Sequence, residues 1–310
     1  MIVLLANLAA IIGYRQRNLQ SFLAAFAAKQ ELLQNTPSPR VILVGGSSVA
    51  YGFDSTALAQ KVGVPVVNMG LQGGLGLRFE LESLKSYIKD GDIIVLSPEY
   101  HNLLGKLTSG EVLSQIVVLY PKTIRYFTTL NEFWQVIRSF PAVHTLAIKN
   151  MLEDLKLRHC LICPNREPIY YLEAFDLTTG DVINNESLVL KDPPTELNVP
   201  YPKDLKGLIE SINLINDFKL FAETRKAAVF FYYPSTINIM NQETSQILKD
   251  LDKKIREELT FPVLNSIANS QYPLEYMFDT AYHLNKTGRA LNTQRLGELL
   301  CQQDQALRCK

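Results

Sequence analysis

The chain has 310 residues, of which 47% are hydrophobic, and its 31 basic and 31 acidic residues give a formal net charge of zero. This size and composition suit one large globular domain with an insertion, or two small domains. Because no basic stripe is interleaved with aromatic residues, the sequence argues against a nucleic-acid partner.

The chain begins with an apolar segment at residues 1–12. It is shorter than the roughly 20 apolar residues that cross a bilayer, and it lacks the basic start of a signal peptide. It is either the distal part of a signal anchor whose start is missing or an apolar helix packed on the domain. We favour an anchor over residues 1–20, with the protein facing the periplasm or the cell exterior. Arg15 and Arg17 oppose this choice, since basic residues favour a cytoplasmic side.

Short apolar segments alternate with helical patterns along the rest of the chain. Strands are predicted at residues 41–44, 65–67, 93–96, 228–233 and 262–264. Helices are predicted at residues 19–34, 77–88, 204–223 and 242–259. This alternation is typical of a parallel sheet covered by helices on both faces. We therefore expect an α/β domain over residues 36–305.

The third and fourth predicted strands are separated by too many residues for a single crossover. An insertion at about residues 103–203 is expected to form a helical cap. Pro121 and Pro141 each stand where a helix could begin. Apolar side chains recur at helical spacing in Phe127, Leu130, Phe133, Trp134 and Ile137. We expect this stripe to pack on the core, with a role in shaping an acyl or glycan pocket as the alternative. Residues 192–202 are predicted to form an extended loop.

Four cysteines are present. Cys160 and Cys163 form a Cys-x-x-Cys pair, and Cys301 lies eight residues before Cys309. The two local pairs are the simplest disulfides, and disulfides would locate the protein outside the cytosol. Free thiols and a zinc site remain alternatives, and the role of the neighbouring His159 stays open.

The most informative motif is at residues 41–52, where an apolar run ends in two glycines and two serines. The glycines let the backbone turn sharply. The turn delivers a serine hydroxyl to the carboxyl end of a strand, where open α/β sheets bind their ligands. A second short strand also ends in glycines, at residues 66–74. Asp279 and His283 follow near the C-terminus.

Together these motifs resemble the SGNH (GDSL-like) hydrolase superfamily, from about residue 39 to residue 300. The first block of that superfamily matches residues 46–48, with Gly52 four residues after Ser48. Its second block, Asn-x-Gly-x-x-Gly, matches Asn68, Gly70 and Gly73. The resemblance implies a three-layer α/β/α, flavodoxin-like parallel sheet of the SGNH type with a helical insertion.

The resemblance also implies the chemistry of a site. Ser48 is expected to be the nucleophile, with its neighbour Ser47 pointing into the fold. His283 is the expected base, and Asp279 the group that orients it, although the spacing between them is one residue longer than usual. The backbone N–H groups of Ser48 and Gly73 are the expected oxyanion hole. Neither a metal nor a cofactor is expected.

The third block departs from the superfamily, since Ser97-Pro98-Glu99-Tyr100 replaces the segment that normally supplies an Asn donor. It is similar instead to the Ser-Pro-Gln-Trp segment of the teichoic-acid D-alanylation protein and related bacterial cell-surface acyl-transfer proteins. An ionised carboxylate cannot donate, so Glu99 is expected to point away or to bind a substrate hydroxyl or amine. Asn68, Tyr100 and His101 complete the expected substrate-binding residues.

These expectations favour a serine-dependent O-acyltransferase or esterase that acts on an acyl ester or a cell-envelope polysaccharide. The alternative is a non-catalytic envelope protein that binds a glycan or a membrane-bound O-acyltransferase. A flavodoxin-like nucleotide binder ranks last, because no phosphate-binding loop follows the first strand.

Overall fold

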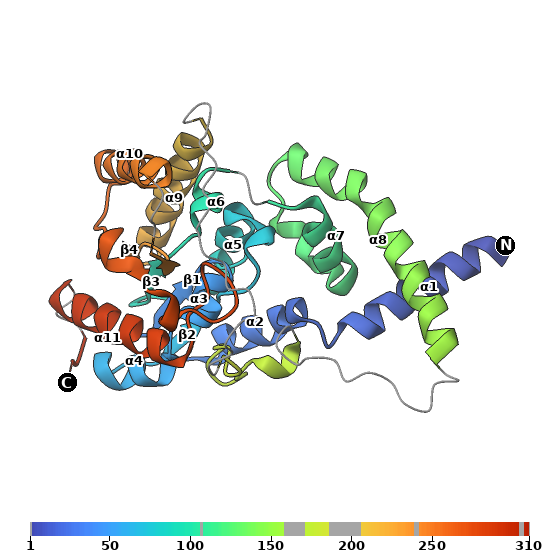
Figure 1. The fold of residues 1–310 in the computed structure, drawn as a ribbon, viewed down its shortest axis with the longest axis horizontal. Coiled ribbons are helices and arrows are strands. Elements are labelled where there is room, and N and C mark those ends of the chain that lie inside the picture. The colour runs from blue at the N-terminus through green and yellow to red at the C-terminus, as the bar shows by residue number, and fades with distance from the viewer. Residues whose placement is uncertain are drawn as a thin grey trace.

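A computed structural model describes residues 2–105, 108–157, 171–185, 206–238, 242–303 and 307–309. At its centre is a parallel sheet of four strands in the order β2-β1-β3-β4 (Figure 1). The strands are β1 Val41–Val44, β2 Val66–Asn68, β3 Ile93–Leu96 and β4 Ala228–Phe231. A mixed α/β fold with a helix-flanked parallel sheet is thus confirmed, and all four strands lie within two residues of the predicted bounds.

The predicted fifth strand is present only as a parallel bridge between Val263 and Phe231. A separate pair of short parallel strands is formed by β5 Thr236–Ile237 and β6 Gln271–Tyr272. Residues 262–264 therefore extend the main sheet beside β4 by a single bridge, not by a regular strand.

The strands of the main sheet are buried on both faces. In β1, Ile42 and Val44 point into one core, and Val41 and Leu43 point into another. Side chains alternate along a strand, so a continuous apolar run needs a cover on each side. The first core is closed by α2 Ala25–Asn35, α5 Leu77–Glu82, α9 Lys206–Thr224 and α10 Gln242–Glu258. The second is closed by α3 Ser47–Gly52, α4 Ser55–Val62 and α11 Lys286–Gln303.

Two predicted helices are divided in the structure. The helix predicted at 19–34 becomes a 3-10 turn at Phe22–Ala24 followed by α2. The helix predicted at 77–88 becomes α5 and a 3-10 turn at Lys85–Tyr87. The helices predicted at 204–223 and 242–259 match α9 and α10 to within about two residues.

The described part of the insertion is mainly helical. It contains α6 Tyr100–Leu103, α7 Gly110–Leu119, a 3-10 turn at Pro121–Tyr126 and α8 Leu130–Leu157. Pro121 begins its turn as expected, but Pro141 lies inside α8 and does not begin a helix. The residues predicted to form an extended loop at 192–202 lie outside the described residues.

The apolar stripe of the insertion faces two ways. Phe127 is 6% exposed and packs in a core with α7, whereas Trp134 is 55% exposed and Ile137 is 59% exposed. The expectation that the whole stripe packs on the core is therefore wrong for α8. Of its apolar side chains from Leu130 to Ile137, those of Leu130, Phe133, Trp134 and Ile137 are exposed, whereas Val136 is partly buried against the core.

The N-terminal segment forms α1 Ile2–Asn18, which projects from the body of the molecule and crosses α8 (Figure 1). Ala10 and Tyr14 of α1 are buried against Val143 and Ala147 of α8 and Val118 of α7. None of the described helices is both long enough and apolar enough to cross a membrane. The anchor stays a prediction.

Cys301 and Cys309 form a disulfide, with their Cα atoms 5.9 Å apart. The bond ties the end of α11 to the C-terminal segment, and it confirms one of the two predicted pairs. Cys160, Cys163 and His159 lie outside the described residues.

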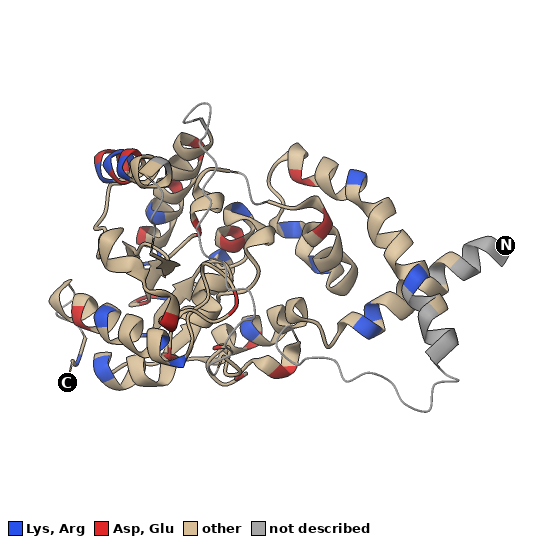
Figure 2. Cartoon of the chain, in the orientation of Figure 1, with Lys and Arg blue, Asp and Glu red and all other residues tan. Residues whose placement is uncertain are grey.

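Charged residues of both signs are mixed over the surface. Figure 2 shows them most densely along α10. There Lys254 pairs with Glu258 at 2.7 Å, and Arg256 pairs with Asp252 at 2.8 Å. Pairs one helical turn apart stabilise an exposed helix modestly, so α10 presents a solvated face of mixed sign.

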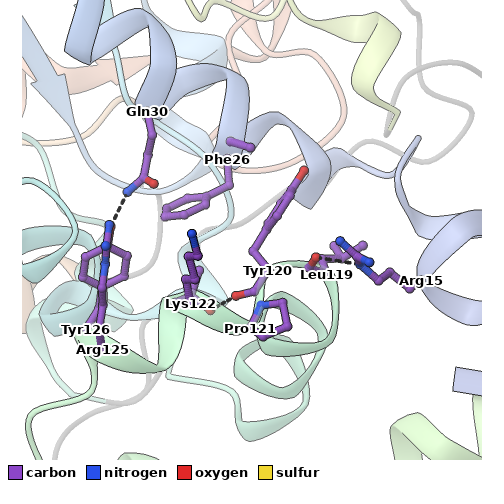
Figure 3. Close-up of a pocket in the computed structure, with 11 residues that line it drawn as sticks. Arg15, Phe26, Gln30, Leu119, Tyr120, Pro121, Lys122, Arg125 and Tyr126 are labelled. Carbon is purple, nitrogen blue, oxygen red and sulfur yellow. Dashed lines mark hydrogen bonds between the residues drawn. The ribbon is translucent and has the colours of Figure 1, made fainter. Parts of the chain in front are cut away.

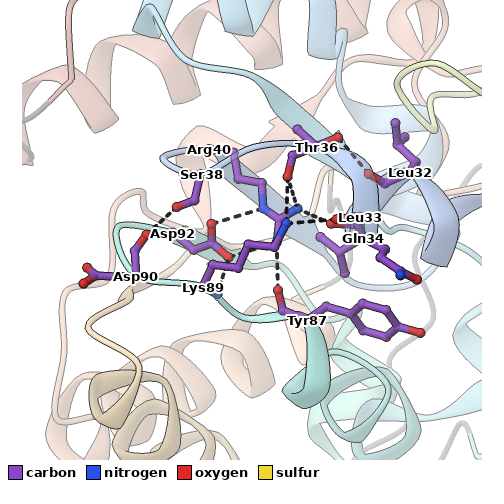
Figure 4. Close-up of polar contacts among 10 residues, drawn as sticks. All are labelled: Leu32, Leu33, Gln34, Thr36, Ser38, Arg40, Tyr87, Lys89, Asp90 and Asp92. Carbon is purple, nitrogen blue, oxygen red and sulfur yellow. Dashed lines mark hydrogen bonds and ion pairs between the residues drawn. The ribbon is translucent and has the colours of Figure 1, made fainter.

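A buried ion pair joins the amino ends of two central strands (Figure 4). Arg40 precedes β1, Asp92 precedes β3, and both side chains are 0% exposed. Arg40 Nε and Nη2 each lie 3.1 Å from a different carboxylate oxygen of Asp92. The remaining guanidinium donors bind the carbonyl oxygens of Leu33, Thr36 and Tyr87. This network secures the sheet at the edge opposite the carboxyl ends of its strands.

Candidate functional site

The serine beside His283 is Ser47, the first residue of α3. Its Oγ lies 2.8 Å from His283 Nε2. Ser48 is only 2% exposed, and its Oγ has no hydrogen-bond partner among the residues that the structure describes. The expectation that Ser48 faces the base and Ser47 points into the fold is therefore wrong. Successive side chains on a helix are turned by about 100°, so a shift of one residue exchanges the two directions.

Asp279 contacts His283 on the other side of the imidazole ring. Its Oδ1 lies 2.6 Å from Nδ1. The segment between them closes into a tight loop, where the N–H of Phe278 donates to the His283 carbonyl at 2.8 Å and Thr280 Oγ1 accepts from the His283 N–H at 3.2 Å. An antiparallel bridge between Met277 and Leu284 flanks this loop. The loop absorbs the additional residue between Asp279 and His283, and the expected contact is present.

Tyr51 is a site residue that the sequence analysis missed. Its ring stacks on the His283 imidazole, with centroids 4.0 Å apart and planes 8° apart. Tyr51 is fully buried and lies four residues after Ser47 on α3. Residues four apart share one face of a helix, so the spacing could have indicated that both meet the same partner. The stack restricts the imidazole to the plane in which it faces Ser47 and Asp279.

Glu99 accepts a hydrogen bond from the Ser48 N–H, one of the two donors expected to form an oxyanion hole. Its Oε1 lies 3.1 Å from the Ser48 N, which donates to it, and 3.2 Å from Ser47 Oγ. A Cβ added at Gly46 would lie 2.6 Å from this oxygen and 2.9 Å from the Gly73 Cα. Gly46 thus packs closely against both the Glu99 carboxyl and the Gly73 backbone, and a side chain at position 46 would collide with both. Of the two alternatives for Glu99, pointing away is therefore wrong, and binding of a substrate hydroxyl or amine stays a prediction.

A second carboxyl lies behind the first. Glu80 of α5 is 8% exposed, and neither of its oxygens has a hydrogen-bond partner within the described part of the chain. Burial, and then the negative charge of Glu99, raise the pKa of Glu80 to about 8. Burial and the same charge also raise the pKa of Tyr282 well above its usual value. The sequence carried no signal for Glu80, which stands on an ordinary amphipathic helix.

Asn68 is structural in this arrangement. It is fully buried, its Nδ2 donates to the Val49 carbonyl at 3.0 Å and to Asp181 Oδ1 at 2.8 Å, and its Oδ1 accepts from the Gly70 N–H. These bonds hold the loop after β2 against the start of α3. The amide of Asn68 is thus committed inside the protein, and the expectation that Asn68 binds substrate stays a prediction.

Tyr100 and His101 lie beside the site but away from the serine. Tyr100 is fully buried, with its ring between those of Tyr233 and Tyr282. Its expected contact with substrate stays a prediction. His101 Nδ1 lies 3.3 Å from the Tyr282 hydroxyl, and the expectation that His101 binds substrate stays a prediction.

A cavity of about 400 Å³ opens over the serine. Ser47 and His283 line it together with Tyr14 of α1, Phe22 and Gln115 of α7. Burial, and then the charge of Glu111, raise the pKa of Tyr14 to about 12, so its hydroxyl is neutral at physiological pH. The cavity therefore offers an aromatic wall and neutral hydrogen-bonding groups around the Ser47 hydroxyl.

A neighbouring cavity of about 290 Å³ shares Leu119 with the first. Figure 3 shows Arg15, Lys122 and Arg125 around it, with Phe26 among its aromatic walls. No carboxylate is among the described residues that line it. Its electrostatics therefore favour an anionic group over a cationic one.

The described residues contain no group of three or more His, Cys, Asp or Glu side chains that could hold a metal ion. The chain was compared with protein-family models, with curated proteins and with solved structures, and nothing matched. The arguments about function therefore rest on the geometry of the site.

Proposed function

We propose that this protein is a serine-dependent O-acyltransferase or esterase of the SGNH type that acts on a cell-envelope glycan. The observation that carries the proposal is the continuous contact from Ser47 Oγ to His283 and on to Asp279, at 2.8 and 2.6 Å. A serine hydroxyl is a weak nucleophile unless a base takes its proton and a third group orients that base. Ser47 takes the role that the sequence analysis assigned to Ser48.

The fold supports the SGNH assignment. The strand order β2-β1-β3-β4 is the beginning of the flavodoxin-like order. Ser47, Gly73 and Glu99 follow β1, β2 and β3, so their elements meet at the carboxyl edge of the sheet. Ligands bind at this edge in open α/β sheets.

The proposed reaction has two half-reactions. His283 Nε2 takes the proton of Ser47 while Ser47 Oγ attacks the carbonyl carbon of an acyl ester. Asp279 accepts a hydrogen bond from the Nδ1–H of the resulting imidazolium. The departing alcohol takes that proton as the carbon–oxygen bond breaks, which leaves an acyl-enzyme on Ser47. An acceptor hydroxyl, or water, then gives its proton to His283 and attacks the acyl carbonyl. His283 returns this proton to Ser47 Oγ as the acyl–oxygen bond breaks, which restores the starting state.

We favour transfer over hydrolysis. The support is the cavity over Ser47, which α1 and α7 help to line. Such a cover can exclude water and position an acceptor hydroxyl. A cell-envelope polysaccharide as acceptor, and a membrane-bound O-acyltransferase as partner, are proposed from the sequence resemblance, as is an anchored position outside the cytosol.

Acyl-enzyme trapping tests the proposal. The protein is mixed with a chromogenic acyl ester, quenched in acid and analysed for an acylated peptide by mass spectrometry. We expect the acyl group on Ser47, its loss in Ser47→Ala with a rate decrease of several powers of ten, and its retention in the matched control Ser48→Ala. Acylation that persists in Ser47→Ala would refute the assignment. Free acid as the main product at every concentration of glycan acceptor would refute transfer and leave an esterase.

One observation favours the second candidate, a non-catalytic envelope protein that binds a glycan or a membrane acyltransferase. Glu99 Oε1 already takes the Ser48 N–H, so an oxyanion cannot reach that donor while Glu99 stays in place. If no ester acylates Ser47 and a glycan still binds with an affinity that Ser47→Ala does not change, this second candidate is correct.

A further inference from the structure

We propose that the cavity between α1, α2 and the turn Pro121–Tyr126 is a subsite for an anionic group, a phosphate or a carboxylate, of the molecule on which Ser47 acts. We call it the cationic cavity; it holds about 290 Å³ and is shown in Figure 3. The inference rests on the proposed function, because it concerns the substrate of the same site. It adds that the substrate is charged, which the contacts around Ser47 and His283 do not specify.

Three cations surround the cationic cavity, and no carboxylate of the described residues lines it. Arg15 comes from α1, and Lys122 and Arg125 come from the turn Pro121–Tyr126. None of the three forms an ion pair with a carboxylate in the described part of the chain. The chain has equal numbers of basic and acidic residues, so this excess of positive charge is local. A concave surface lined by one sign of charge concentrates counter-ions, and here the counter-ion is an anion.

Contacts within the protein hold two of the cations in place. Arg15 Nε donates to the Leu119 carbonyl at 3.1 Å, and among the described residues no acceptor takes its two terminal nitrogens. Arg125 Nη2 donates to the Tyr126 hydroxyl at 2.6 Å, and its guanidinium carbon lies 4.8 Å from the centroid of the same ring. Gln30 Nε2 donates to that hydroxyl at 2.8 Å. A guanidinium fixed in this way offers its remaining donors to the oxygens of a phosphate or a carboxylate.

Lys122 supplies the third charge from an apolar surrounding. Its amine points toward Phe26 in Figure 3 and has no hydrogen-bond partner among the residues that the structure describes. Phe26 is 5% exposed and Tyr126 is 6% exposed, so aromatic walls replace part of the water around the cavity. An ion pair is stronger beside such walls than on an open surface. An anion that enters therefore gains a partner that the protein itself does not supply.

The cationic cavity adjoins the cavity over Ser47. Tyr14 and Arg15 are consecutive on α1, and Tyr14 lines the cavity over Ser47 whereas Arg15 lines the cationic cavity. Leu119, at the end of α7, lines both. A single molecule can therefore bring its ester or hydroxyl to Ser47 while its anionic group lies among the cations.

The sizes of the two cavities indicate a substrate larger than a simple ester. They hold about 400 and 290 Å³, and each lies near the lower end of the range of about 300–1,000 Å³ that is typical of ligand pockets. Together they suit a molecule that extends from Ser47 to the cations. Phosphate and carboxylate both match the donors of a guanidinium. The geometry thus points to the charge of the group, and the test identifies its chemistry.

Binding of three sugars to the full chain tests the cationic cavity without any catalytic step. Glucose 6-phosphate carries a phosphate, glucuronate carries a carboxylate, and glucose is the neutral reference. Dissociation constants are measured by titration with nuclear magnetic resonance. At least one anion should bind about tenfold more tightly than glucose, and added salt should weaken the binding of that anion alone. The tighter of the two anions identifies the group.

Variants of Lys122 show whether the cationic cavity is the place of binding. Lys122→Met should weaken the binding of the anion about tenfold, whereas Lys122→Arg keeps the charge and should keep most of the affinity. The matched control is Lys253→Met on α10, where Lys253 is 76% exposed and pairs with Glu257 at 3.9 Å; it should bind as the wild type does. Thermal unfolding checks that each variant is folded. Equal affinities for glucose and both anions, or equal losses in Lys122→Met and Lys253→Met, would overturn the anionic subsite.

Competition with acylation tests the link to Ser47. The anion that binds should slow acylation of Ser47 by a neutral chromogenic ester, and its inhibition constant should rise about tenfold in Lys122→Met. An anion that binds and leaves acylation unchanged would overturn the claim that the cationic cavity belongs to the substrate site. Without acylation of Ser47 by any ester the proposed acyl chemistry is wrong, and the titrations then decide by themselves whether the cavity binds an anion.

Discussion

Replacing Asp92 with Ala should destabilise the protein strongly. Asp92 accepts from Arg40 Nε and Nη2 at 3.1 Å each and from the Lys89 N–H at 2.9 Å, and its side chain is fully buried. Removal leaves a buried guanidinium without its anion. Breaking a buried ion pair in this way costs about 3–5 kcal/mol in the free energy of unfolding. That is a large part of the 5–15 kcal/mol that is typical of a domain.

Asp90 supplies a matched control only two residues away (Figure 4). Its carboxylate pairs with Lys226 at 3.0 Å, but the two side chains are 69% and 79% exposed. Water screens such a pair, so Asp90→Ala should lower the free energy of unfolding by less than about 1 kcal/mol. The double variant Arg40→Met with Asp92→Leu removes both charges, and it should be more stable than Asp92→Ala.

The assay is equilibrium unfolding in urea, followed by far-UV circular dichroism, with the slope against urea checked for each variant. Arg40 and Asp92 lie at the amino ends of their strands, and Ser47 lies at the opposite edge of the sheet. The folded fraction of Asp92→Ala should therefore be acylated on Ser47 by the chromogenic ester at the wild-type rate. A loss for Asp92→Ala no larger than that for Asp90→Ala would refute the view that burial, and not the pairing itself, determines the cost.

Three further predictions follow from the site and its surroundings. Tyr51→Ala removes the ring that stacks on His283 and should lower kcat about tenfold with little change in KM. Tyr51→Phe keeps the ring and should keep most of the rate. Equal losses of kcat in the two variants would contradict a role of the ring. The pKa of Glu80 is raised to about 8 in the folded protein, so the folded state binds an extra proton between the unfolded pKa and pH 8. The free energy of unfolding should therefore fall as the pH rises from 5 to 8. In Glu80→Gln this decline, measured by urea unfolding, should be smaller, and an unchanged decline would contradict the raised pKa of Glu80. Cys301→Ser opens the loop closed with Cys309 across a separation of eight residues and should cost about 2–3 kcal/mol on unfolding without reductant, whereas an unchanged unfolding midpoint would argue that the bond constrains little.

The sequence alone determined the central sheet and the general place of the site. β1 and β3 match their predicted ends because four apolar residues in a row, buried on both faces, can only be central strands. The carboxyl ends of parallel strands meet at one edge, so the glycine and serine segments after β1 and β2 were bound to lie together. Asp279 and His283 were predicted as partners because their order after the serine resembles that of the SGNH superfamily, and their side chains are in contact.

The tertiary structure alone decided which side chains meet within that site. Ser47 and Ser48 are chemically identical neighbours, and the start of α3 directly after Gly46 determines which one faces His283. Glu99 reaches the Ser48 N–H because its strand lies beside β1, a pairing that no local pattern contains. α8 presents apolar side chains to solvent, which the sequence could not reveal. Periodicity shows that a helix has an apolar face, but it does not show whether another element covers that face. Local patterns specify elements, whereas directions and contacts depend on how those elements pack.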